Sequence, residues 1–182
     1  MCMEWLPLSN RTFEKVKSET RLGEKIEMLI PGFRGYKLKE LRREADRLIR
    51  NYLYQQLTMT KEDLKAIYQR LVDNKLNDVW TDMDRLITNI DTVASEINHA
   101  SYGYSGFFDA IKINERNLDA MLDYDTKLID NFGSLGVKVK QFKSEALSNR
   151  FENTKTHINE IRSSIDLLDK LYNERKNAIL GV

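Results

Sequence analysis

Apolar residues recur at spacings of three and four over most of the chain, which is the period of an α-helix that buries one face. The longest such run extends from Leu64 to Ile97 without a glycine or proline, and it predicts one helix over residues 61–98. At a helical rise of about 1.5 Å per residue this element is roughly 57 Å long, so we expect an elongated molecule. The apolar positions in its most regular part are Leu76, Val79, Met83, Leu86, Ile90, Val93 and Ile97.

A second long helix is predicted over residues 137–180, with a regular apolar seam in its C-terminal half. Because only about half of the central helix remains for this element to pack against, we expect the seam to overhang and to mediate self-association into a homo-oligomer. The alternative is that the helix bends at residues 153–156 and folds back onto its own bundle. The residues of the seam are Ile158, Ile161, Ile165, Leu168 and Tyr172.

Start and stop signals predict three shorter helices. The first begins at Ser9 and ends at Pro31, and the second occupies about 21 residues before Thr60. Another begins after Asn114 and ends around residues 133–136, where two glycines occur. Thr60 is expected to be the N-cap of the long central helix, because a Ser or Thr with an acidic residue three positions later favours a helix start.

The sequence contains no alternating strand pattern, and its two prolines and eight glycines suit a helix-rich chain. We therefore expect an all-α fold, an elongated antiparallel bundle of about five helices that forms a single domain over residues 1–182. The predicted helix lengths place Trp80 where several helix ends converge, so this residue would mark a waist between two half-bundles.

Charge and cysteine content narrow the functional classes. The formal net charge is +1, so the whole molecule has no bulk attraction to nucleic acid, which we do not expect as a partner. The single cysteine excludes an internal disulfide framework, and no apolar run approaches the roughly 18 residues of a membrane span. These features favour a cytoplasmic protein.

Two glycine-aromatic stretches, residues 31–37 and 102–109, are the least generic parts of the chain. Their glycines permit turns that other residues avoid, and their rings could grip a protein partner. The alternative is that the rings plug the ends of the bundle. The candidate partner-binding residues are Phe33, Arg34, Tyr36, Tyr102, Tyr104, Phe107 and Phe108.

Three segments, PGFRGYK at 31–37, LRREADR at 41–47 and YGYSGFFD at 102–109, resemble a family of small all-helical prokaryotic proteins that has no assigned activity. The resemblance covers about the first two thirds of the chain. It implies a prokaryotic source and supplies no catalytic residue.

A basic face is predicted on the second helix, where it could meet the phosphates of an anionic membrane surface or of nucleic acid. Acidic residues lie three or four positions before the arginines, so the alternative is a solvated face whose charges balance one another. The candidate anion-binding residues are Lys39, Arg43, Arg47 and Arg50.

Glu96 and His99 form one Glu-x-x-His pair, the element that di-metal carboxylate bundles use twice. A second copy is absent, because His157 and Glu160 occur in the reverse order. We therefore expect no metal ligands, no cofactor and no catalytic residue, and His99 is better explained as a cap at a helix C-terminus.

These patterns favour a non-enzymatic helical protein that acts in protein–protein interaction or as a scaffold. The first alternative is a peripheral module that binds anionic lipid or nucleic acid through the basic helix. The second alternative is a di-metal carboxylate oxidoreductase.

Overall fold

The computed structural model describes residues 24–32, 42–100 and 115–180. Within these ranges the chain forms helices and turns and no strand, which confirms the all-α prediction. The helices are α2 (Arg42–Asp73), α3 (Trp80–His99), α6 (Glu115–Leu147) and α7 (Thr154–Leu180), with a short 3-10 helix η2 (Asn77–Val79) before α3 and a short helical segment at residues 24–29.

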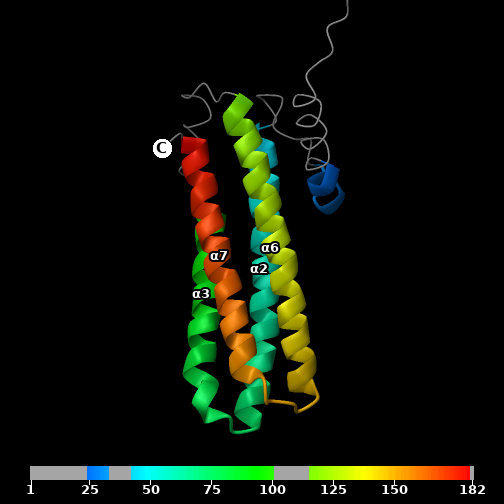
Figure 1. The fold of residues 1–182 in the computed structure, drawn as a ribbon, viewed down its shortest axis with the longest axis vertical. Coiled ribbons are helices and arrows are strands. Elements are labelled where there is room, and N and C mark those ends of the chain that lie inside the picture. Colours follow the sequence, from blue (N-terminus) through cyan, green and yellow to red (C-terminus); the bar gives the residue numbers. More distant parts are fainter. Residues whose placement is uncertain (1–23, 33–41, 101–114, 181–182) are drawn as a thin grey trace, which may run out of the picture.

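The four long helices form a bundle of two side-by-side hairpins (Figure 1). Helix α2 packs antiparallel to α3, and α6 packs antiparallel to α7, while α2 also lies against α6 and α3 against α7. Each helix turns one apolar stripe inward, and together these stripes make one continuous core. The bundle therefore has two distinct ends. We call the end where α2 joins α3 and α6 joins α7 the turn end, and the opposite end, where residues 33–41 and 101–114 attach, the loop-bearing end.

Helix α3 is shorter than its neighbours. It has 20 residues and α7 has 27, and both begin at the turn end. The difference of seven residues corresponds to about 10 Å of helix. At the loop-bearing end, α2, α6 and α7 therefore project beyond the point where α3 ends.

The predicted single helix over residues 61–98 is wrong, because the chain reverses between Asp73 and Trp80. Lys75 adopts a left-handed conformation with φ of 60°. Its N–H donates to the carbonyl of Val72, and the N–H of Leu76 donates to the carbonyl of Leu71, which is the Schellman pattern of a helix C-terminus. The turn lacks the glycine or proline that normally marks such a reversal. The apolar spacing continues across it, so the spacing alone predicts one unbroken helix.

Thr60 is not an N-cap. It lies within α2 and is buried, and its hydroxyl donates to the carbonyl of Gln56 one turn earlier at 2.9 Å. A threonine can satisfy its hydroxyl in this way inside a helix, so the same residue type fits both positions. The predicted second helix and the first part of the predicted central helix are therefore one element, α2.

The predicted boundary around residues 133–136 and the predicted helix over 137–180 are also wrong. Helix α6 runs through Gly133 and Gly136 as far as Leu147. A glycine inside a helix costs only about 1 kcal/mol, which the packing of a 33-residue helix can offset. The actual turn is at Asn149, which has φ of 54°.

Trp80 does not mark a waist. It is the first residue of α3 and lies at the turn end of the bundle, partly buried. The prediction failed because it depended on the two long helices that the structure divides.

The seam expected to overhang lies in the core of the molecule, with each side chain at most 4% exposed. Helix α7 folds back against α6 and α3, as the alternative interpretation proposed. The prediction of self-association depended on this seam being exposed, and the seam is buried within the chain's own bundle. The residues concerned are Ile158, Ile161, Ile165, Leu168 and Tyr172.

Candidate functional site

The loop-bearing end gathers the attachment points of both glycine-aromatic stretches. Residues 33–41 lead directly into α2, and residues 101–114 connect the end of α3 to the start of α6. These attachment points lie at the same end of the bundle because α2 and α6 begin there and α3 ends there (Figure 1). The aromatic candidates themselves lie outside the described residues; they are Phe33, Arg34, Tyr36, Tyr102, Tyr104, Phe107 and Phe108.

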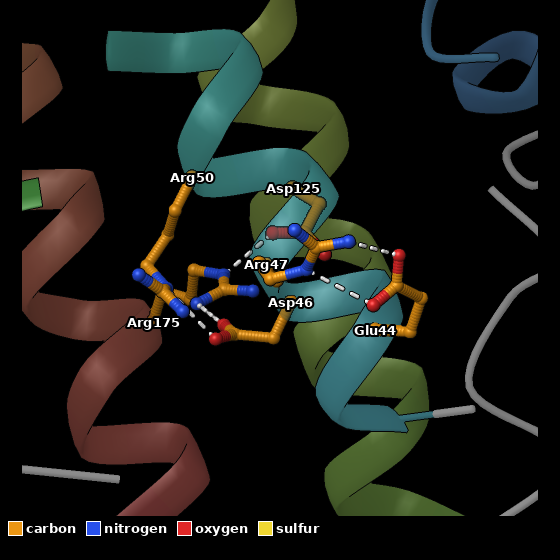
Figure 2. A network of polar contacts seen from close by, with 6 residues as sticks. All are labelled: Glu44, Asp46, Arg47, Arg50, Asp125 and Arg175. Carbon is orange, nitrogen blue, oxygen red and sulfur yellow. Dashed lines mark hydrogen bonds and ion pairs between the residues drawn. The ribbon is translucent and has the colours of Figure 1, made fainter. Parts of the chain in front are cut away.

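Four buried charged residues, Asp46, Arg50, Asp125 and Arg175, form a cluster close to this end, which we call the charged layer (Figure 2). Arg175 of α7 donates from Nε to Oδ1 of Asp125 at 2.5 Å and from Nη1 to Oδ1 of Asp46 at 2.8 Å. Arg50 donates from Nε to the other oxygen of Asp46 at 2.8 Å. The layer thus links α2, α6 and α7, and its two carboxylates balance its two guanidinium groups.

Burial makes the pairing of these charges essential. Arg175 is 1% exposed and Asp125 is 0% exposed, so neither can exchange its partner for bulk water. Burial by itself raises the pKa of the Asp46 carboxyl, but the charges and hydrogen bonds of Arg175 and Arg50 outweigh it and hold that pKa below its ordinary value. The carboxylate of Asp46 therefore stays ionised at neutral pH.

The charged layer lies in the section of the bundle that α3 does not reach. Counted from the turn end, α3 extends for 20 residues, which brings its end level with residue 173 of α7 and residue 128 of α6. Arg175 and Asp125 lie beyond that level, as does Asp46 on α2. The layer therefore adjoins the point where the chain leaves α3 and enters residues 101–114.

The sequence carries one signal for this layer. Arg175 follows Ile161 and Leu168 at intervals of seven, so it continues the apolar stripe of α7 into the core. A charged residue at such a position needs a buried partner of opposite charge. The sequence does not identify Asp46 or Asp125 as that partner, because only the fold brings residues 129 and 50 positions away to Arg175.

A buried polar contact also lies at the turn end. His157 of α7 is buried, and its Nε2 lies 2.9 Å from Oε2 of Glu145 on α6. Its ring stacks on Phe142 with a centroid separation of 5.0 Å. Hydrogen bonds from His157 and Gln141 hold the pKa of the Glu145 carboxyl below its ordinary value. This cluster joins α6 to α7 next to their turn.

The candidate anion-binding residues are separated by the structure. Arg47 is exposed and forms a two-point ion pair with Glu44, with its shorter contact at 2.6 Å. Arg50 points into the core and belongs to the charged layer, so a surface anion cannot reach it. Lys39 lies outside the described residues, as does the side chain of Arg43.

The two histidines lie at opposite ends of the bundle. His99 is exposed at the C-terminus of α3, where its Nδ1 lies 2.8 Å from the carbonyl oxygen of Ser95. His157 is at the other end, and Glu160 one turn along α7 is exposed. Over residues 24–32, 42–100 and 115–180, no group of three or more His, Cys, Asp or Glu residues is placed to hold a metal ion.

Surface hollows in the described part are shallow. One of 230 Å³ lies between α3 and α7, lined by Asn89, Thr92, Glu96 and Asp169 among others. Another of 260 Å³ lies at the turn end beside Leu76. Both fall below the roughly 300 to 1,000 Å³ that is usual for small-molecule sites.

The comparisons with known proteins give no relative: the chain matches no family model, no curated protein and no solved structure at a significant level. The helices of the described part also include none that is long and apolar enough to cross a membrane.

Proposed function

We propose that this protein is a non-enzymatic scaffold that recognises a protein partner through the two glycine-aromatic stretches that attach at its loop-bearing end. One observation carries the proposal: both loops attach to the same end of one bundle, directly above the charged layer. Loops that bind partners are commonly held by a rigid framework of this kind.

The charged layer supports this assignment. Arg175 ties α7 to both α2 and α6 through directional hydrogen bonds, and two of these three helices begin where a loop ends. Fixing the attachment points of the two stretches in advance lowers the entropy cost of binding a partner. The aromatic side chains of the loops are the type that dominates binding energy at protein interfaces.

The alternative function, binding to anionic lipid or nucleic acid, keeps fewer of its predicted residues. Arg50 is buried, and Arg47 is already paired with Glu44. The proposal includes a cytoplasmic setting, which the single cysteine supports.

Partner capture from a lysate of the native cell tests the proposal. The tagged full chain is compared with a Tyr104→Ala, Phe107→Ala variant, and with Arg150→Ala, an exposed residue at the turn end, as the matched control. The loop variant should lose the captured protein while its helical circular dichroism is unchanged, and the control should retain it.

Equal capture by wild type and the loop variant would refute the proposal. Capture is also measured between 50 and 500 mM salt, over which the Debye length falls from about 14 to about 4 Å. If the loop variant still captures the protein and high salt abolishes this capture, the anionic-ligand alternative is favoured instead.

A further inference from the structure

The outer face of α6 carries a regular line of exposed residues. Helix α6 packs against α2 on one side, where Lys143 pairs with Asp63, and against α7 on the other, where Lys138 contacts Ser164. Between these two sides, exposed positions recur at spacings of three and four, so they share one helix face. We call these residues the outer seam: Asp130, Gly133, Val137, Lys140 and Ser144.

An exposed valine and a glycine lie one turn apart at the centre of the outer seam. Val137 is 66% exposed, more than any other large apolar side chain of the four long helices in the described part. A Cβ built on Gly133 would meet no atom within 4 Å, so packing within the bundle does not require glycine there. Glycine weakens a helix but lets another backbone approach closely. One exposed valine is ordinary on a protein surface, whereas a valine beside an open glycine fits a helix that carries the same pair.

The charges on either side of this centre have opposite signs. Lys140 forms no ion pair with a described residue. Asp130 pairs with Lys25, yet the Asp130 side chain remains 55% exposed and can accept a second cation. Asp130 and Lys140 each lie five positions from position 135, and Gly133 and Val137 each lie two positions from it. Both pairs therefore have the same centre along the helix.

We propose that the protein forms a dimer in which the outer seams of two copies of α6 pack antiparallel. Pairing centred on position 135 places Lys140 of one copy against Asp130 of the other. It also places Val137 of each copy over Gly133 of the other, and the twofold axis repeats both contacts. A parallel arrangement would instead bring like charges together at Asp130 and again at Lys140.

The self-complementarity of the outer seam favours a second copy over an unrelated protein. In a twofold interface, residue i contacts residue j and residue j contacts residue i, which is the relation that the shared centre gives. The contact from Asp130 to Lys140 spans ten residue steps, or about 15 Å of helix. An interface of this length is small, so we expect a dimer that dissociates on dilution.

This interface differs from the one predicted for α7, whose seam is buried. Because α6 begins at the loop-bearing end, antiparallel pairing directs the two loop-bearing ends of the dimer away from each other. The inference does not rest on the proposed function, since the outer seam and the glycine-aromatic stretches are different parts of the chain.

Sedimentation velocity of the full chain over a wide range of protein concentration tests the dimer. Wild type should change from monomer to dimer as the concentration rises. Lys140→Glu places like charges together twice and should raise the dissociation constant at least about tenfold. The double variant Asp130→Lys, Lys140→Glu exchanges the two charges and should recover most of this loss. The matched control is Glu160→Lys, an exposed residue on α7, which should dimerise like wild type.

Gly133→Leu separates the interface from the fold. The space beside Gly133 is empty within the chain's own bundle, so a leucine should leave the melting temperature of the monomer unchanged or raise it. The same side chain fills the space that receives Val137, and the dissociation constant should rise at least about tenfold.

A wild-type chain that stays monomeric up to the highest soluble concentration would overturn the proposal. A dimer that tolerates both Lys140→Glu and Gly133→Leu would also overturn it, because its interface would lie elsewhere. If Lys140→Glu weakens the dimer and the double variant fails to recover it, the antiparallel pairing of Asp130 with Lys140 is wrong.

Discussion

At the turn end the described helices are held by apolar packing, by surface ion pairs such as Lys155–Asp78 and by the buried contact of His157 with Glu145, whereas at the loop-bearing end the interior contains four charged residues. The apolar half tolerates a range of side chains of similar size, because burial is not directional. The charged layer requires each donor to face its acceptor, as Arg175 faces Asp46 and Asp125. The difference indicates that the turn end supplies stability, while the loop-bearing end fixes the arrangement of three helix ends.

The largest expected effect comes from breaking the charged layer. Arg175→Met leaves the carboxylates of Asp46 and Asp125 without their shared partner, and removing one side of a buried ion pair costs about 3 to 5 kcal/mol of unfolding free energy. Chemical denaturation measures this loss. The double variant Asp125→Asn, Arg175→Met keeps the buried Asp46–Arg50 pair and leaves no unpaired charge, so it should recover most of the loss. A single variant as stable as wild type would show that the layer is not buried as described.

Truncating a core side chain toward the turn end should lower the unfolding free energy by slightly less than breaking the charged layer. Ile161 is 0% exposed on α7, and Ile161→Ala removes buried methyl groups and leaves a cavity, at a cost of about 2 to 5 kcal/mol. The matched control is Leu167→Ala, because Leu167 on the same helix is 46% exposed and its truncation should change stability by about 0.5 kcal/mol or less. Equal losses for both variants in denaturation would contradict the orientation of α7.

Acid should weaken the charged layer. The pKa of Asp46 is lower in the folded protein than its ordinary value, so the folded state binds fewer protons there than the unfolded state. Its stabilising contribution is complete above the ordinary pKa of about 3.9 and is lost as pH falls through the lower folded value. Unfolding free energy measured between pH 6 and pH 2 should therefore fall less steeply in Asp46→Asn than in wild type, although that variant is less stable at pH 6. If unfolding free energy falls with pH equally steeply in both proteins, Asp46 does not contribute to the acid sensitivity.

The smallest effect is expected at Trp80. Its indole Nε1 is buried and has no hydrogen-bond partner among the described residues, so Trp80→Phe removes an unsatisfied donor together with some apolar volume. These terms oppose each other, and the net change in unfolding free energy should be below about 1 kcal/mol. A loss above about 3 kcal/mol would mean that Trp80 has the packing expected of a central position.

Helical class and core faces could be read from the sequence, because periodicity reports directly which side of a helix is buried. The core is lined, as their spacing indicates, by the apolar seam positions of α7 from Ile158 to Tyr172 and of α3 from Met83 to Ile97. The reversals could not be read reliably, since Lys75 turns the chain with neither glycine nor proline, and Gly133 stands inside a helix. Placing the turns wrongly displaced Trp80 and made a buried seam look exposed.

The charged layer shows a second limit of prediction from the sequence. Arg175 could be recognised as a charge at a core position, but its partners are set by which helices become neighbours, and that depends on the two turns the periodicity missed. For the same reason, the apparent basic face of the second helix included Arg50, whose side chain belongs to the interior.

The central claim is that the charged layer positions the loop-bearing end for the proposed partner. A variant with Asp46→Leu, Arg50→Leu, Asp125→Leu and Arg175→Met replaces the layer by apolar side chains, a change that is often neutral or stabilising for folding. We expect this variant to melt at or near the wild-type temperature and yet to capture markedly less of the proposed protein partner, because the three helix ends lose their directional contacts. Full capture of the partner by the folded variant would contradict the claim.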